Sequence, residues 1–255
     1  TVFLALLLIV TLFAFGRKNI REFAPAGKDI FFAATTLLLF LLITQLGTAL
    51  SHAIAEQLAI GTTTGWYYLI PVAAAGMLIR LVLNNEHAIV FTIVFSILAG
   101  VVADNSLFYA AYTALGTLVG VATVQQVKHR MALMWSGVTV GAINVASILA
   151  FMLISGEFFQ STATTIGTAM IGFGGGLFAG LVVLSILPVF EALFSYTTDI
   201  KLLELANLNH PLLRQLIMRA PGSYHHSMMV GSLCEAAARA VDAPPPLRRD
   251  GADYH

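Results

Sequence analysis

The sequence predicts an all-α protein, a polytopic membrane helix bundle of seven spans followed by a helical tail. Of its 255 residues, 58% are hydrophobic and 10% are charged, whereas soluble domains carry about 25% charged residues. The mean hydropathy is +0.86, and apolar runs recur at the roughly 20-residue length that crosses a bilayer. We therefore divide the chain into a membrane domain, residues 1–195, and a tail, residues 196–255.

Seven apolar runs are candidate spans. They are Thr1–Phe15, Ile30–Leu50, Tyr67–Leu83, Ala88–Ala103, Leu107–Val127, Ala132–Ile154 and Thr165–Leu187. The first begins within an apolar run on Thr instead of Met, so we expect it to be truncated. The fourth is short and turns tightly into the fifth. These two segments could therefore form a hairpin that does not cross the whole membrane.

The basic residues predict the orientation of the spans. Arg80 ends span 3, and the others follow spans 1, 5 and 7: Arg17, Lys18, Arg21, Lys28, Lys128, Arg130, Lys201, Arg214, Arg219, Arg239, Arg248 and Arg249. Loops 51–66, 104–106 and 155–164 contain none. Because positive charge marks the cytoplasmic side, we expect the start of the chain outside and the tail inside. Trp66, Tyr67 and Tyr68 then lie at the outer interface and Trp135 near the inner one.

Ionisable residues are nearly absent from the middle of the predicted spans. Such residues normally mark an ion or proton pathway, so a transporter or channel is disfavoured. The most polar side chains at mid-span are Gln45 and Asn144, for which hydrogen bonds between helices are expected. The net charge of zero gives no argument for a nucleic-acid polymer as a partner, and we expect none.

A glycine stripe in the last span predicts close helix packing. Gly172, Gly176 and Gly180 repeat every fourth residue, a spacing that lets two helix backbones approach. Gly174 and Gly175 are expected to add flexibility. The membrane domain therefore has the features of an anchor or sensor.

The tail is expected to begin with helices laid on a soluble core. Pro188 is taken as the end of the last span, and a new helix is expected after APGS, with Ser223 as its N-cap. His226 then lies on the same face as Val230 and Leu233, and His225 points about 100° away. A histidine on an apolar face is either a buried imidazole bonded to a carbonyl or a metal ligand, and spacing leaves both alternatives open.

Three motifs in the tail resemble one family. LPVFEALFSYTTDIKLLEL, HPLLR and APGSYHHS occur in this order over residues 187–227, as in the seven-transmembrane HD phosphohydrolases (PgpH-like). LRRDGADYH, residues 247–255, matches the start of the family's HD motif. The aspartate of that motif lies beyond His255, so we expect the chain to be truncated at this end too.

The resemblance implies a bacterial cytoplasmic-membrane enzyme whose HD domain faces the cytoplasm. The implied activity is hydrolysis of a cyclic dinucleotide, cyclic di-AMP to the linear dinucleotide, at two divalent metal ions (Mn or Fe). Matched residue by residue, His226 and His255 are metal ligands, and His225 contacts the substrate or supports a ligand. The implied partners are the cyclic dinucleotide and the lipid bilayer. Formation of a homo-oligomer is left as an open alternative.

A non-catalytic seven-span sensor or binding module is the alternative. It is favoured for the chain as it stands, because only the first metal-ligand positions of the family are present. We therefore expect these 255 residues alone to be inactive. One cysteine, Cys234, excludes an intramolecular disulfide.

Overall fold

The computed structural model describes residues 27–58, 63–124, 130–156, 158, 161–194, 196, 198, 215 and 218–240. Within these ranges the regular secondary structure is helical without any strand, which confirms the all-α prediction there. The expected first span, Thr1–Phe15, lies outside the described residues. The chain divides into two compact units, Thr1–Ser195 and Tyr196–His255, and each is treated by itself.

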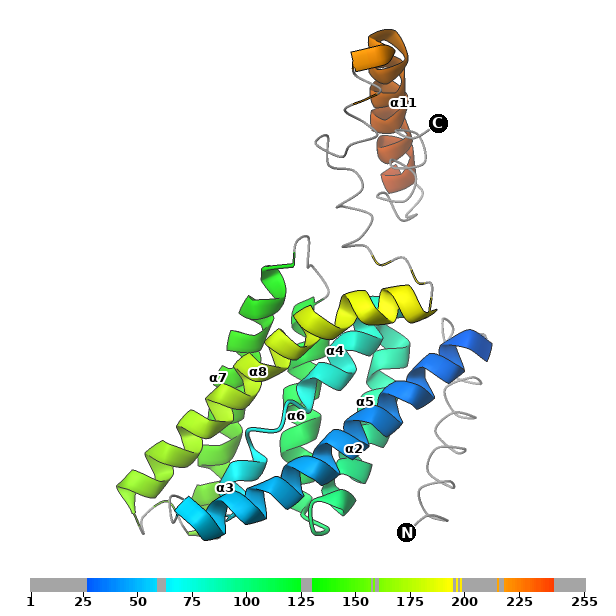
Figure 1. Cartoon of the computed structure of the whole chain (residues 1–255). Coiled ribbons are helices and arrows are strands. Elements are labelled where there is room, and N and C mark those ends of the chain that lie inside the picture. Colours follow the sequence, from blue (N-terminus) through cyan, green and yellow to red (C-terminus); the bar gives the residue numbers. More distant parts are fainter. Residues whose placement is uncertain are drawn as a thin grey trace. The chain divides into compact units, whose positions relative to one another are not determined.

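The first unit is a bundle of apolar helices (Figure 1). Its helices are α2 (Gly27–Leu58), α3 (Thr63–Tyr67), α4 (Ala73–Val82), α5 (Asn85–Val102), α6 (Leu107–Thr123), α7 (Ala132–Ser155) and α8 (Thr162–Phe194). By length and composition α2, α5, α7 and α8 are able to cross a membrane, whereas α4 and α6 are shorter apolar helices. Four of the seven predicted spans are thus present as full-length helices among the described residues.

The third predicted span, Tyr67–Leu83, is not one helix. It begins at Tyr67, the last residue of α3, and continues through a non-helical stretch at residues 68–72 into α4. Pro71 lies in this stretch, lacks a backbone N–H, and disfavours helical geometry at the preceding residue. The Tyr68 carbonyl is not left without a partner, because the Tyr112 hydroxyl donates to it at 2.8 Å. Such irregular backbone is tolerated at membrane depth where protein buries it.

Helix α4 is the centre of the unit. It packs against α2, α5, α6 and α8, and every residue from Ala73 to Ile79 is buried. The one charged residue of α4, Arg80, lies in its last turn. The apolar turns before it belong in a protein interior, which explains why a ten-residue helix is stable here. Gly76 permits the closest approach, since a Cβ there would lie 2.2 Å from Thr117 Cγ2.

Helices α7 and α8 pack through glycines, as the stripe predicts. A Cβ on Gly176 would lie 2.2 Å from the backbone nitrogen of Gly141, and one on Gly180 would lie 2.8 Å from the Leu133 carbonyl oxygen. Asn144 Nδ2 donates to the Gly172 carbonyl oxygen at 3.1 Å. That bond confirms the interhelical role predicted for Asn144.

Two other polar or flexible positions differ from expectation. Gln45 is exposed on α2, and its backbone oxygen accepts a hydrogen bond from Thr48 Oγ1. Gly175 is a contact position and not only a flexible one, because a Cβ there would lie 2.1 Å from the Tyr68 carbonyl oxygen. The missing side chain of Gly175 thus makes room for the broken segment between α3 and α4.

Helix α8 continues past the residue expected to end it. Pro188 lies inside the helix, which runs to Phe194. The helix persists because its last turns pack on α2: Phe32 lies 5.5 Å from Phe190 and 5.2 Å from Phe194 between ring centroids. Phe31 adds a third ring pair, with Phe194 at 5.9 Å. We call Phe31, Phe32, Phe190 and Phe194 the aromatic clamp.

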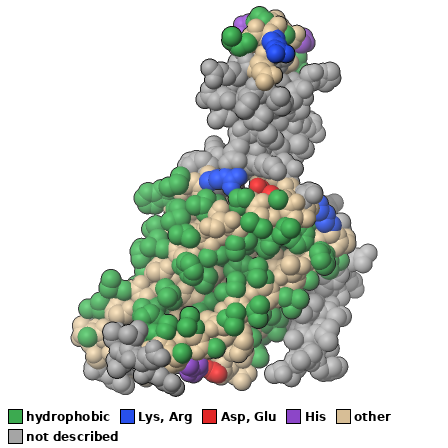
Figure 2. Space-filling view, in the orientation of Figure 1, with side chains coloured by type: hydrophobic (Ala, Val, Ile, Leu, Met, Phe, Trp, Pro, Cys, Tyr) green, Lys and Arg blue, Asp and Glu red, His purple; other side chains and the backbone are tan. Residues whose placement is uncertain are grey.

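Helix α2 has two distinct faces. Leu38, Leu42, Leu46 and Leu50 are each more than half exposed, and this four-residue repeat forms one apolar stripe. The buried face carries Thr36, Thr44, Thr48 and Ser51, whose hydroxyls donate to carbonyls of their own helix. Hydrophobic side chains cover the visible face of the bundle (Figure 2), as expected of a surface in contact with lipid. The first unit is therefore a multi-pass membrane bundle.

Candidate functional site

Two of the three predicted site histidines, His225 and His226, lie on α11 (Pro221–Ala240), in the second unit. The helix begins at Pro221, which corrects the expectation that Ser223 is the N-cap. Residues 218–219 are also helical and Ala220 is not, so a break between helical residues does lie within APGS, as expected. Proline is well suited to the first helical position, where its missing N–H costs no hydrogen bond. In this first turn Tyr224 N donates a hydrogen bond to the Ala220 carbonyl oxygen at 3.0 Å.

Both His225 and His226 are exposed. His225 borders an open apolar groove on α11, whose other lining residues are Tyr224, Met228, Met229, Ser232 and Leu233. Leu233, on the predicted face of His226, is 70% exposed. That face is thus uncovered in the described part of the chain, where the sequence led us to expect packing on a core.

The described residues do not make up a metal centre. His225 and His226 are consecutive and so project about 100° apart on the helix, which prevents both from binding one ion in the usual way. Among the described residues no group of three or more His, Cys, Asp or Glu side chains is placed to hold a metal. His255 lies outside the described residues. The metal site therefore stays a prediction.

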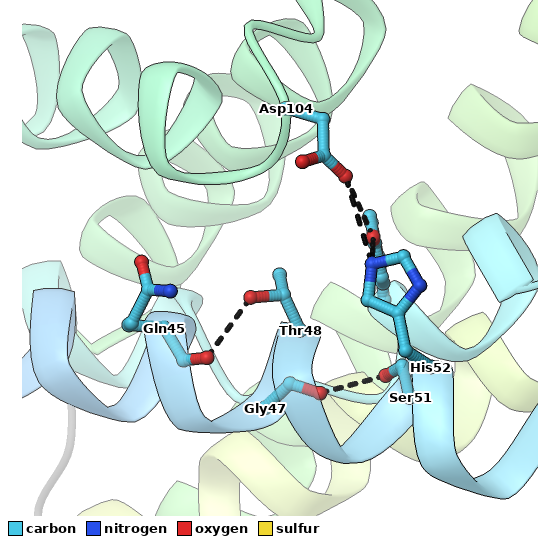
Figure 3. Close-up of polar contacts among 7 residues, drawn as sticks. Gln45, Gly47, Thr48, Ser51, His52 and Asp104 are labelled. Atoms are coloured by element: carbon cyan, nitrogen blue, oxygen red, sulfur yellow. Dashed lines mark hydrogen bonds and ion pairs between the residues drawn. The ribbon is translucent and has the colours of Figure 1, made fainter.

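A second polar site lies in the membrane unit. It consists of His52 on α2, Tyr67 at the end of α3 and Asp104 in the turn between α5 and α6; we call it the polar cluster (Figure 3). Tyr67 Oη donates to Asp104 Oδ2 at 2.8 Å and lies 2.7 Å from His52 Nε2. His52 Nε2 and Asp104 Oδ2 are 3.8 Å apart. Three segments distant in sequence are thus joined through one phenol.

The turn between α5 and α6 aims Asp104 at the cluster. Asp104 and Asn105 have φ angles of 57° and 58°, a left-handed conformation that aspartate and asparagine adopt more readily than most residues. Ser106 follows as the N-cap of α6, its hydroxyl accepting from Tyr109 N at 3.1 Å. Gly100 lets α5 approach this turn, since a Cβ there would lie 3.0 Å from the Ser106 carbonyl oxygen.

Tyr67 is the fixed member of the polar cluster. Its side chain is 4% exposed, and its ring packs edge-on against Tyr109 with centroids 6.1 Å apart. The short helix α3 is not among the helices long enough to cross a membrane. Burial, and then the Asp104 carboxylate, raise the pKa of Tyr67 to about 12. The phenol therefore keeps its proton over the physiological pH range and acts as a donor to Asp104.

Sequence reasoning did not single out His52 or Asp104. Both fall in stretches predicted as loops, 51–66 and 104–106, which were identified only by their lack of basic residues. They are far apart in the chain, and His52 lies on α2 in the structure. The available signal was that each is an ionisable side chain next to the end of a predicted span. Tyr67 was predicted to lie at the membrane interface, but its partners follow only from the fold.

Comparison with known proteins identifies the family. A family model described as "7TM receptor with intracellular HD hydrolase" matches residues 1–198. The chain belongs to this family. It is 32% identical to cyclic-di-AMP phosphodiesterase PgpH of Bacillus subtilis over 97% of this chain, and 35% identical to the protein of the same name from Listeria monocytogenes over 74% of it. No solved structure matches the chain.

The comparisons concern mainly the membrane part of a larger architecture. The chain spans 35% of the length of the B. subtilis relative and 26% of the Listeria one. The family match covers α2 to α8 and ends before α11 begins. The recognised resemblance to PgpH-like seven-transmembrane HD proteins is thus confirmed.

Proposed function

We propose that the chain is the membrane-anchored part of an HD-type, metal-dependent phosphohydrolase that converts cyclic di-AMP to the linear dinucleotide. The observation that supports this most is the alignment of 97% of the chain with a protein named cyclic-di-AMP phosphodiesterase. The family description, a membrane receptor with an intracellular HD hydrolase, gives the same class of activity. The substrate and the activity of this chain are proposed from its likeness to these proteins.

The proposed site begins on α11 and is completed by residues beyond those described. His226 and His255 are proposed as metal ligands, and His225 as a contact to substrate or to a ligand. The exposure of His225 and His226 supports a role that needs access from solvent. The proposed ions are manganese or iron, and divalent ions in such sites activate water and stabilise charge at phosphorus.

The proposed role of the membrane unit is that of anchor and sensor. In the proposed orientation α11 and the HD part face the cytoplasm of a bacterium, with loop 51–66 outside, as the segregation of basic residues indicates. These 255 residues alone are proposed to be inactive, because a binuclear centre needs more ligands than His226 and His255 supply.

The test is hydrolysis of cyclic di-AMP by the purified full-length product of the gene, with manganese. We expect turnover that EDTA removes and that His226→Ala abolishes. Ser232→Ala is the matched control, since Ser232 is also exposed on α11 and its hydroxyl bonds its own helix at Met228. A folded full-length protein that binds cyclic di-AMP without hydrolysing it would instead support the non-catalytic sensor.

A further inference from the structure

The polar cluster has a proton arrangement that the fold dictates. A phenol has one hydrogen, and Tyr67 donates it to Asp104. The 2.7 Å contact between Tyr67 Oη and His52 Nε2 is then a hydrogen bond only if His52 supplies the proton. The order of donation therefore runs from His52 to Tyr67 to Asp104, and it requires a proton on Nε2.

Protonation of His52 strengthens this arrangement. A neutral imidazole is free to place its single proton on either ring nitrogen, and the Nδ1 form leaves two acceptors facing each other at 2.7 Å. The imidazolium carries a proton on both nitrogens and adds an attraction to the Asp104 carboxylate 3.8 Å away. The link through Tyr67 is therefore tighter when His52 carries the second proton.

The groups that face His52 come from each neighbouring element. Tyr67 faces it from α3 and Asp104 from the turn before α6, and Tyr109 of α6 lies behind Tyr67. On α2 itself the sequence places Glu56 one turn further on. The side chains of His52 and Asp104 are 55% and 73% exposed. Protons in the surrounding water therefore reach both.

Helix α2 connects the polar cluster with the aromatic clamp. From Phe32 to His52 is 20 residues, or about 30 Å at 1.5 Å per residue, which equals the hydrocarbon thickness of a bilayer. One end of α2 thus contacts the cluster, and the other contacts the last turns of α8 through Phe190 and Phe194. A rigid helix carries a displacement at one end to the other.

We propose that His52, Tyr67 and Asp104 form a proton-sensitive joint whose protonation shifts α2 relative to α8. In the proposed orientation this joint lies at the outer face, so the membrane unit reports external pH at the inner end of α8. The inference does not require the phosphodiesterase activity, because its readout is a distance within the membrane unit. A partly exposed ion pair is weak, so we expect a change of roughly two- to fivefold in conformer populations.

The test measures the distance between α2 and α8 by pulsed electron spin resonance. Cys234→Ser removes the native cysteine, and spin labels are attached at Leu38→Cys and Leu181→Cys, which replace exposed residues of the two helices. The full chain is placed in lipid nanodiscs at pH 8 and at pH 5.5. We expect the populations of the distance distribution to change two- to fivefold, and an unchanged distribution would overturn the proposal.

Variants separate the joint from general effects of acid. His52→Gln keeps an N–H donor but does not titrate, so we expect it to abolish the pH response; Asp104→Asn, which removes the charge, should weaken it. His87→Gln is the matched control, because His87 is the histidine at the start of α5, and its variant should respond as the parent does. A response that persists in folded His52→Gln would refute the joint.

Discussion

Replacement of Gly176 by alanine should destabilise the membrane unit strongly, because the atoms that a Cβ would meet cannot move aside. They belong to the backbone of α7: the nitrogen and Cα of Gly141 at 2.2 and 2.4 Å, and the Gly137 carbonyl oxygen at 2.9 Å. Ordinary contact begins at 3.4 Å. The nearest pair must therefore open from 2.2 to 3.4 Å, a separation of about 1.2 Å.

The size of the loss follows from that separation. A gap of 0.5–1 Å already forfeits roughly a quarter to a half of each dispersion contact, and the α7–α8 contact is the most extensive in the unit. Overpacking that side chains absorb costs about 1–3 kcal/mol. No side chain can move to absorb the added methyl group here, so we expect Gly176→Ala to lower the free energy of unfolding by about 3 kcal/mol. At 2–4 °C per kcal/mol this corresponds to a decrease of about 6–12 °C in Tm.

The assay is thermal unfolding in detergent, monitored by circular dichroism, against a matched control. Gly167→Ala is that control, since it makes the same change on the same helix α8 where a Cβ meets nothing within 4 Å. It should leave the Tm unchanged or raise it, because alanine favours a helix over glycine by about 1 kcal/mol. Equal melting temperatures for the two variants would refute the close packing of α7 and α8.

Three further predictions follow from the same structure. Asn144→Ala should lower the free energy of unfolding by about 0.6–2 kcal/mol through loss of the bond to Gly172, and unchanged melting would contradict that role. In a Cys234→Ser background, a cysteine at Thr63 should react with an impermeant maleimide in intact cells and one at Lys18 should not; the reverse pattern would invert the orientation. The purified 255-residue chain should not hydrolyse cyclic di-AMP, and chelator-sensitive turnover would show that its ligands suffice.

The positions of most membrane helices could be predicted from hydropathy, but the effect of each proline could not. Pro71 and Pro188 both interrupt apolar runs, yet the helix breaks at Pro71 and continues through Pro188. The difference is tertiary: the peptide groups near Pro71 find a partner in Tyr112 and space beside Gly175. Around Pro188 the packing of the Phe190 and Phe194 rings on Phe32 of α2 favours a continuous helix. Neither context is visible in a local window of sequence.

The functional positions, too, could be predicted from the sequence only in part, because some of them depend on tertiary packing. The glycine repeat and Asn144 act through helix spacing that the sequence displays directly, and the structure agrees with both. His52 and Asp104 meet because α3 lies between α2 and the turn after α5. Such pairing of distant residues depends on how the helices are ordered in space. The motif histidines were found by family resemblance, and their helix begins earlier than capping rules indicated.

The buried position of α4 also determines how the protein has to enter its membrane. Ten residues of helix span about 15 Å, half of the hydrocarbon layer, so α4 is too short to partition into lipid as an independent segment. Besides α2, it packs more extensively against α5, α6 and α8, which are all synthesised after it. Insertion of α4 must therefore wait for downstream helices, and the nascent chain exposes it to the insertion machinery until they arrive. Biogenesis of this bundle is accordingly cooperative, with its most central helix completed late.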